Sequence, residues 1–384
     1  MGEAPVTRGE GRLDACPRCG SELQEREERK QKWASSHKRQ KGAQAALNTV
    51  LSQAQQGTYV APSRQTLAQF VSEWLPAARV TVRESTWASY RANLTLHVLP
   101  QLGHLQLREL SASQLNALYG ELLENGRRDG SGGLSPRTVQ LCHVTVHRVL
   151  KDAVRWGRLS RNVSDNADGP RVRRPEIRAW DASELRRFLG HVRDDRLSGL
   201  YTLAATAGMR RGELGLRWSD VDFDAGRVRV RQSLVVTNYR PHFSEPKTQR
   251  SRRSIALDGG TVAALKAHRA RQLEERLAWG ASWTDSGLCF TKEDGSHLHP
   301  EQVTNAFERH VRDAGLPRLS FHGLRHTFAT IALGAGLHPK VVSDRLGHSN
   351  ISITLDTYSH VIESVGEDAA TKIGGLILGD SANG

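Results

Sequence analysis

The spacing of apolar residues constrains the fold of this chain most, because it is helical over long stretches and changes to a two-residue repeat near residue 230. In GRVRVRQSLVVT and again in RRSIAL, apolar and polar residues alternate, which predicts a short antiparallel sheet within residues 228–257. Apolar residues recur at helical spacing on both sides of that region. We therefore predict a mainly α fold with a small antiparallel β-sheet, of the α+β class.

The first half of the chain predicts a small helical domain. Its first helix starts at Thr66 and carries Phe70 and Trp74 on one face, and Pro76 predicts where it ends. Further helices are predicted over residues 85–96, 113–123 and 135–156. Residues 162–175 contain turn formers and basic residues without an apolar repeat, which indicates a linker between domains.

The second half is predicted to be helical around the sheet. Asp181, with Glu184 three residues later, is typical of a helix start, and that helix should run to Val192. Further helices are expected over residues 200–207 and from starts at Thr261, Pro300, His322 and Pro339. The predicted division is an N-terminal basic segment, a helical domain, a linker, a second domain and a tail: 1–62, 63–162, 163–175, 176–370 and 371–384.

The charge of the chain favours a polyanionic partner. It has 384 residues, with 54 Lys and Arg against 41 Asp and Glu, a formal net charge of +13. DNA, RNA and anionic membranes all remain open on charge alone. The first residues lack the apolar run of a signal peptide, and no stretch approaches the ~20 apolar residues that span a bilayer. We expect a soluble, cytoplasmic protein.

Two stretches contain cations suited to phosphate chemistry. In TAGMRRGEL, Arg210 precedes Glu213 by about one helical turn, and a guanidinium can hold two phosphate oxygens at once. An Arg beside a Glu is, however, more often a surface ion pair. In EPKTQRSRRSIAL, Lys247 precedes a strand and could protonate a leaving oxygen, or it could be one more solvated charge.

Three stretches nearer the C-terminus add histidine, arginine and tyrosine. FHGLRHTFAT places His322 and Arg325 three residues apart on one helical face. DRLGHSNIS places His348 just after a helix-ending glycine, where an imidazole is usually structural or exposed. ITLDTYSHV places Tyr358 in a predicted short helix, where a lone tyrosine usually packs in the core. Together and in this order, the Arg, Lys, His and Tyr residues of the five stretches could perform every step needed to cleave a phosphodiester without a metal.

The five stretches together resemble the signature of the tyrosine recombinase (phage integrase) family. GMRRGEL, PKT, HGLRHTFAT, LGH and DTYSHV match that signature nearly word for word, and the resemblance covers about residues 66–361. It implies a helical core-binding domain of the SAM-like kind, followed by a catalytic domain, which together clamp DNA. It also implies that Tyr358 attacks the scissile phosphate and forms a 3′-phosphotyrosine without ATP or metal.

The resemblance assigns roles residue by residue. Arg210 and Arg325 would neutralise the phosphate oxygens in the transition state. Lys247 would protonate the departing 5′-oxygen, and His322 would accept or share the tyrosine proton. His348 would hydrogen-bond a phosphate oxygen. Glu213 would support the site from behind the residues that touch DNA. No cofactor is implied.

The implied partners are double-stranded DNA attachment sites, on which the protein would act as a homotetramer. An accessory directionality or DNA-bending factor is a further implied partner, and no membrane is involved. The implied function is site-specific recombination that integrates or excises a phage or other mobile element. Two alternatives remain open from the sequence: a type IB topoisomerase, which would not need paired sites, and a non-catalytic DNA-binding regulator derived from an integrase.

The N-terminal segment departs from the family pattern. Related integrases often begin with a three-stranded domain that binds arm-type DNA and ends in a helix and linker, and residues 43–62 resemble that helix and linker. The strands are not recognisable before it, and CPRCG occupies part of their place. Cys16 and Cys19 could form half of a zinc site, but a structural zinc usually needs four nearby ligands, so no metal site is predicted.

Overall fold

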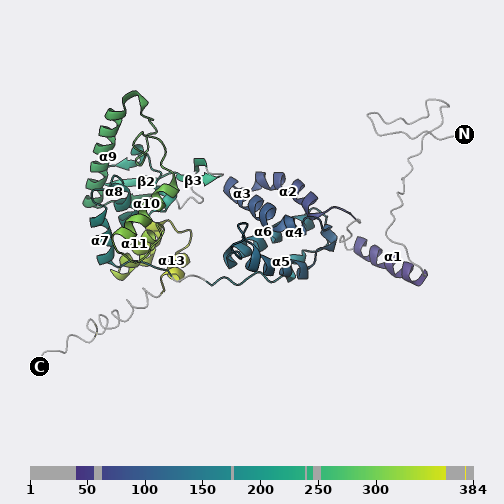
Figure 1. Cartoon of the computed structure of the whole chain (residues 1–384). Coiled ribbons are helices and arrows are strands. Elements are labelled where there is room, and N and C mark those ends of the chain that lie inside the picture. Colours follow the sequence, from purple (N-terminus) through teal and green to yellow (C-terminus); the bar gives the residue numbers. More distant parts are fainter. Residues whose placement is uncertain are drawn as a thin grey trace, which may run out of the picture.

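The computed structural model describes residues 40–55, 63–173, 177–237, 240–244, 252–359 and 377. Helices dominate these residues and form two bodies, each with its own apolar core. Figure 1 shows the two bodies side by side, with helix α1 (Gln40–Gln55) standing apart from them towards the N-terminus. The predicted mainly α fold with a small antiparallel sheet is confirmed.

The first body, here called the helical unit, comprises residues 63–173. Its first helix begins with a capping box in which Thr66 and Gln69 bond each other's backbone N–H groups. Apolar faces meet around Phe70, Trp74 and Leu115, which are fully buried. The helices of this unit are α2 (Leu67–Thr81), α3 (Glu84–Asn93), η1 (Leu94–Val98), α4 (Leu99–Leu102), η2 (Leu107–Glu109), α5 (Ala112–Asn125) and α6 (Pro136–Arg155).

The prediction that the first helix ends at Pro76 is wrong, because α2 continues to Thr81 with the proline inside it. A proline in a helix interior removes one backbone hydrogen bond and costs about 3 kcal/mol. Two tertiary contacts hold the helix together across it. Ala78 is buried against the core, and Trp87 Nε1 donates to the Leu75 carbonyl at 2.9 Å.

The beginning of the predicted linker packs on the helical unit. Residues Val163–Asn166 form a short 3-10 helix, η3, which contacts α5 and α6 and buries Ser164. The Asp168 backbone N–H then donates to Asn116 Oδ1 at 2.8 Å. Residues 174–176 lie outside the described residues.

The second body, here called the C-terminal unit, comprises the described residues from 177 to 359. Asp181 and Glu184 form the predicted capping box, and the aromatic rings of Trp180, Phe188 and Phe307 pack together in its core. Its main helices are α7 (Ala182–His191), α8 (Ser198–Ala207), α9 (Gly259–Trp279), α10 (Pro300–Asp313), α11 (Gly323–Gly334), α12 (Pro339–Leu346) and α13 (Ile351–Thr357). Its short 3-10 helices are η4 (Arg211–Leu214), η5 (Trp218–Asp220) and η7 (Gly280–Ser282).

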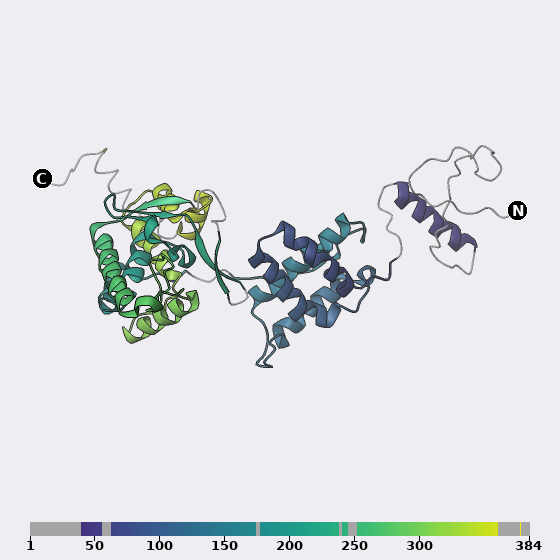
Figure 2. The same ribbon diagram turned by 90° about the horizontal axis from the view of Figure 1, so that it is seen from above.

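Two antiparallel sheets accompany these helices. The order β1-β2-β5 joins Val221–Asp222, Arg227–Val230 and Arg253–Ala256, and Val228 faces Ile255 in the register. Burial alternates along β2, so Arg227 and Arg229 point outwards. The second sheet is the hairpin of β3 (Ser233–Thr237) and β4 (Arg240–Ser244), and β3 lies against α3. Figures 1 and 2 show this hairpin reaching from the C-terminal unit towards the helical unit.

Candidate active site

One carboxylate lies between two arginines at the start of η4. Arg210 Nη1 donates to Glu213 Oε1 at 2.8 Å, and Arg253 Nη2 donates to Glu213 Oε2 at 2.9 Å. Arg253 reaches this point from β5, where it shares the inward face with buried Ile255. Arg210 Nη2 also donates to the Gly347 carbonyl at 3.2 Å, so the C-terminal end of α12 helps to fix this guanidinium.

Glu213 is ionised in this arrangement. Burial by itself would raise the pKa of its carboxyl, but hydrogen bonds and charge from Arg253 and then Arg210 hold that pKa below its usual range. The side chain is 5% exposed, while that of Arg210 is 38% exposed. Glu213 therefore anchors two arginines from behind and leaves one side of Arg210 open to a ligand.

Arg325 of α11 is buried, and no carboxylate of the described residues forms an ion pair with its guanidinium. Its Nη1 donates to the Gly208 carbonyl and its Nη2 to the Leu346 carbonyl, both at 2.8 Å. Burial, and then the charge of Arg210, lower the pKa of Arg325 to about 9. Three guanidinium groups and one carboxylate leave this cluster with net positive charge. Because the two carbonyl bonds use two of five N–H donors, the guanidinium retains donors for an anion.

His348 follows the left-handed Gly347 that ends α12. Its Nδ1 lies 2.8 Å from the Thr354 hydroxyl of α13, which fixes the orientation of the ring. Burial, followed by the charges of Arg325 and Arg210, lowers the pKa of His348 to about 4. The imidazole is therefore neutral at physiological pH and lies within the electrostatic influence of both arginines.

His322 lies at the N-cap of α11 and is exposed. Partial loss of solvent around its ring, and then the charges of His326 and Arg325, lower the pKa of His322 to about 4. Its ring meets the ring of His326 edge to face, with centroids 5.0 Å apart. His322 is therefore a neutral imidazole at the open edge of the cluster.

Tyr358 comes immediately after α13, at its C-cap, rather than inside the helix. The side chain is 1% exposed and packs with Leu333, Val342 and Leu346. Its hydroxyl lies 2.8 Å from His326 Nδ1. Burial raises the pKa of Tyr358 to about 12, although the charge of Arg325 acts in the opposite direction.

The structure brings together most of the residues that the sequence singled out. Arg210, Glu213, Arg325 and His348 form one cluster through the backbone of Gly347 and its neighbours. Tyr358 is linked to the cluster by its electrostatic interaction with Arg325. His322 lies at the edge of the cluster, with its ring against that of His326. Lys247 lies outside the described residues, as do Cys16 and Cys19.

Two residues of the cluster were missed in the sequence. His326 is four residues after His322, a spacing that places both on one helical face, and it directly follows Arg325. Arg253 is two residues before the apolar Ile255, so the strand repeat places them on the same face. Both signals were present in stretches already singled out.

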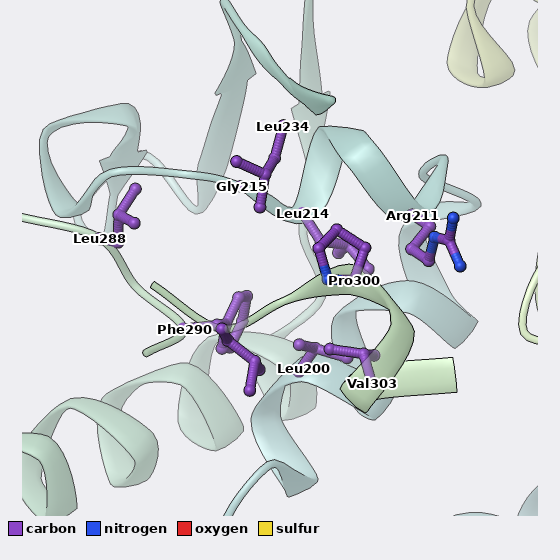
Figure 3. Close-up of a pocket in the computed structure, with 10 residues that line it drawn as sticks. Leu200, Arg211, Leu214, Gly215, Leu234, Leu288, Phe290, Pro300 and Val303 are labelled. Atoms are coloured by element: carbon purple, nitrogen blue, oxygen red, sulfur yellow. The ribbon is translucent and has the colours of Figure 1, made fainter. Parts of the chain in front are cut away.

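An apolar pocket lies beside this cluster but does not contain it. Figure 3 shows Leu214, Leu234, Phe290 and Val303 around the hollow, with Arg211 at one side. None of the residues predicted to act in catalysis lines this pocket. Apart from Arg211, its lining is apolar and unsuited to a phosphate.

The described residues contain no group of three or more His, Cys, Asp or Glu side chains placed to hold a metal ion. Cys142 and Cys289 are both buried free thiols. No helix among the same residues has both the length and the apolar character required to cross a membrane.

Comparison with known proteins points to one family. The phage integrase family model matches residues 179–364, and the phage integrase N-terminal SAM-like domain matches residues 66–123. The XerC-like tyrosine recombinase of Caldanaerobacter subterraneus subsp. tengcongensis is 27% identical over 365 residues, covering 89% of this chain and 91% of that protein. The chain belongs to the tyrosine recombinase (phage integrase) family.

Other members of the tyrosine recombinase family agree with this assignment. An integrase of Streptomyces ambofaciens is 28% identical over 349 residues, covering 87% of this chain and 86% of its own length. The Tn1549 transposon integrase, solved in complex with transposon right end DNA, shares the fold with a TM-score of 0.65 at 20% identity, covering 79% of this chain and 99% of that chain. These relatives favour neither a topoisomerase nor a non-catalytic regulator.

Proposed function

We propose that this tyrosine recombinase cleaves and rejoins DNA at specific sites through a covalent bond between Tyr358 and a 3′-phosphate, and so integrates or excises a phage or other mobile element. The observation that carries the proposal is the buried Arg325 guanidinium. It has no carboxylate partner among the described residues, and it lies beside Arg210 and His348. Such a guanidinium suits an anion that enters from solution.

The two arginines would hold the scissile phosphate. Arg210 and Arg325 are fixed by backbone carbonyls and Glu213, so their donors are oriented before DNA arrives. Preorganised donors act most strongly where negative charge develops in the transition state. His348 would add a hydrogen bond to a phosphate oxygen, since its Nδ1 is engaged by Thr354 and its Nε2 remains for a ligand.

Tyr358 would be the nucleophile. Its oxygen attacks phosphorus and gives up its proton to a neutral imidazole of the site, while the bond from phosphorus to the 5′-oxygen breaks. Lys247 protonates the 5′-oxygen as it leaves. The phosphotyrosine conserves the energy of the broken bond, so a 5′-hydroxyl from another strand can reverse the step without ATP or metal.

The assembly that would perform strand exchange is a homotetramer on two paired double-stranded attachment sites, in the bacterial cytoplasm. The net charge of +13 supports binding to the DNA backbone. An accessory directionality or DNA-bending factor would act with it. Dependence on paired sites is the property that would separate this activity from relaxation by a topoisomerase.

Covalent trapping tests the proposal. Nicked half-site oligonucleotides are made from the DNA junctions that flank the coding region, so that the cleaved strand cannot be rejoined. We expect the native chain to form a protein–DNA adduct stable in detergent and Tyr358→Phe to form none.

A gel-shift measurement supplies the control, because Tyr358→Phe should bind the same DNA as well as the native chain does. An adduct that persists in Tyr358→Phe would contradict the proposal. So would its absence from the native chain on DNA that the chain binds specifically.

A further inference from the structure

The Tyr358 hydroxyl contacts a histidine that the mechanism above does not use. Tyr358 Oη lies 2.8 Å from His326 Nδ1, and the centroids of the two rings are 5.8 Å apart. Apolar side chains of α11 and α12 surround the tyrosine ring, including Leu333 and Leu346. The position of the reacting oxygen is therefore set by the packing of the ring and by its contact with His326.

The protonation states favour a bond that runs from the phenol to the imidazole. Burial, and then the charge of Arg325, lower the pKa of His326, so the ring is neutral. Burial raises the pKa of Tyr358 to about 12, so the phenol keeps its proton. The phenol then donates its one hydrogen to the Nδ1 lone pair, and the ring hydrogen of His326 is on Nε2.

His322 is placed differently. The family resemblance implies that His322, one helical turn before His326, accepts or shares the tyrosine proton. Its ring contacts the His326 ring edge to face, with centroids 5.0 Å apart. Within the part of the chain that the structure describes, the hydrogen bond of the Tyr358 hydroxyl goes to His326 and not to His322.

We propose that His326 is a further catalytic residue, which takes the phenol proton of Tyr358 during attack; this inference rests on the proposed function. As the bond from Oη to phosphorus forms and the bond to the 5′-oxygen breaks, the proton moves from Oη to Nδ1. The departing 5′-oxygen receives a separate proton, from Lys247 in the mechanism above. In rejoining, the proton returns from Nδ1 to Oη as the 5′-hydroxyl attacks.

Two substitutions separate proton transfer from positioning. His326→Asn can place an amide oxygen near the position of Nδ1, so it can still accept the hydrogen bond but takes no proton at neutral pH. His326→Phe keeps a ring between His322 and Tyr358 and has no acceptor. We expect single-turnover cleavage of the nicked half-site to fall about 100-fold or more in both variants, the usual range for losing a general base. A role in positioning alone predicts near-native cleavage by His326→Asn.

A more acidic nucleophile provides the decisive measurement. A fluorotyrosine at position 358 has a phenol that loses its proton more readily and so depends less on a base. It should accelerate cleavage by His326→Phe at least 10-fold more than it accelerates the native chain. His322→Phe is the matched control, because it removes a neighbouring imidazole on the same helix face and should show no such rescue.

Several outcomes would overturn the inference. These are native cleavage rates in both His326 variants, faster cleavage in either, or equal acceleration by fluorotyrosine in native and variant chains. Thermal melting checks that each variant is folded, and if His326→Phe is not, His326→Asn with fluorotyrosine provides the same comparison. Failure of the proposed function is distinguishable, because the native chain itself would then form no adduct.

Discussion

At the scale of single residues, Glu213 is the support on which two arginines depend. Its side chain is 5% exposed and accepts hydrogen bonds from Arg210 and Arg253. Glu213→Gln keeps the shape but removes the negative charge between two guanidinium groups, and breaking a buried ion pair costs about 3–5 kcal/mol. We expect the free energy of unfolding, measured with urea, to fall by about 3 kcal/mol.

The control for this substitution is another glutamate in the same unit. Glu213 and Glu184 are both the N3 residue of a capping box, at the starts of η4 and α7. At Glu184 glutamine serves equally well. Glu184→Gln should therefore leave the free energy of unfolding nearly unchanged. Equal losses in the two variants would mean that the arginines do not need the Glu213 charge.

His348 gives stability a defined dependence on pH. Its pKa is about 4 in the folded chain, chiefly because of burial and then of Arg325, whereas an unfolded imidazole titrates near about 6.5. As pH falls below about 6.5, the imidazole of His348 takes up a proton in the unfolded chain but stays neutral in the folded chain. The free energy of unfolding is therefore highest above that pH and declines towards pH 4. His348→Asn removes this titration. From pH 7 to pH 5 it should lose less free energy of unfolding than the native chain; equal losses in urea titrations would contradict this.

The sequence singled out residues that the structure brings together, but not the contacts between them. Order and spacing were enough to single out Arg210, Arg325, His348 and Tyr358, because the short sequence motifs contain them. They could not decide which histidine meets the Tyr358 hydroxyl, since that depends on how α13 packs against α11. His326 lies in the same sequence motif as Arg325, but its contact with Tyr358 is visible only in the structure.

At the scale of elements, local capping signals predicted helix starts well. Asp181, Pro300 and Pro339 mark starts that the structure contains, because caps act within a few residues. The end of α2 was not predictable from Pro76 alone. The contacts that carry the helix past the proline come from Trp87 and from the core of the helical unit, and a local rule does not include them.

Gly347 joins the end of α12 to the site. Its φ is 67°, and a Cβ there would lie 2.8 Å from Arg253 Nη1, while its carbonyl accepts a bond from Arg210. Gly347→Ala should cost about 1–2 kcal/mol for the left-handed backbone and should also displace Arg253. We expect cleavage of the nicked half-site to fall at least 10-fold.

Gly336, just beyond α11, is the matched control. Its φ is 80°, and a Cβ there would meet nothing within 4 Å. Gly336→Ala carries the same backbone strain without the clash, so it should lose stability and retain cleavage. If both alanine variants lose cleavage alike, backbone strain rather than contact with the arginines is responsible.

At the scale of the whole molecule, the two units share no core residue. Leu115, with the rest of the first core, lies in the helical unit, and Leu203 lies in the core of the C-terminal unit. The composition of residues 162–175 predicted a break between domains, but a stretch without an apolar repeat carries no information about how the domains are oriented. The approach of β3 to α3 therefore had no signal in the sequence.

Separate cores predict separate unfolding. Leu115 and Leu203 are both 0% exposed, and truncating a buried leucine to alanine typically costs about 2–5 kcal/mol. Calorimetry of the free protein should show two transitions, with Leu115→Ala lowering the temperature of one and Leu203→Ala that of the other. Because each cavity opens in a core that the other unit does not touch, the unaltered transition should stay in place. A single transition lowered by both substitutions would show instead that the contact between β3 and α3 couples the units into one cooperative body.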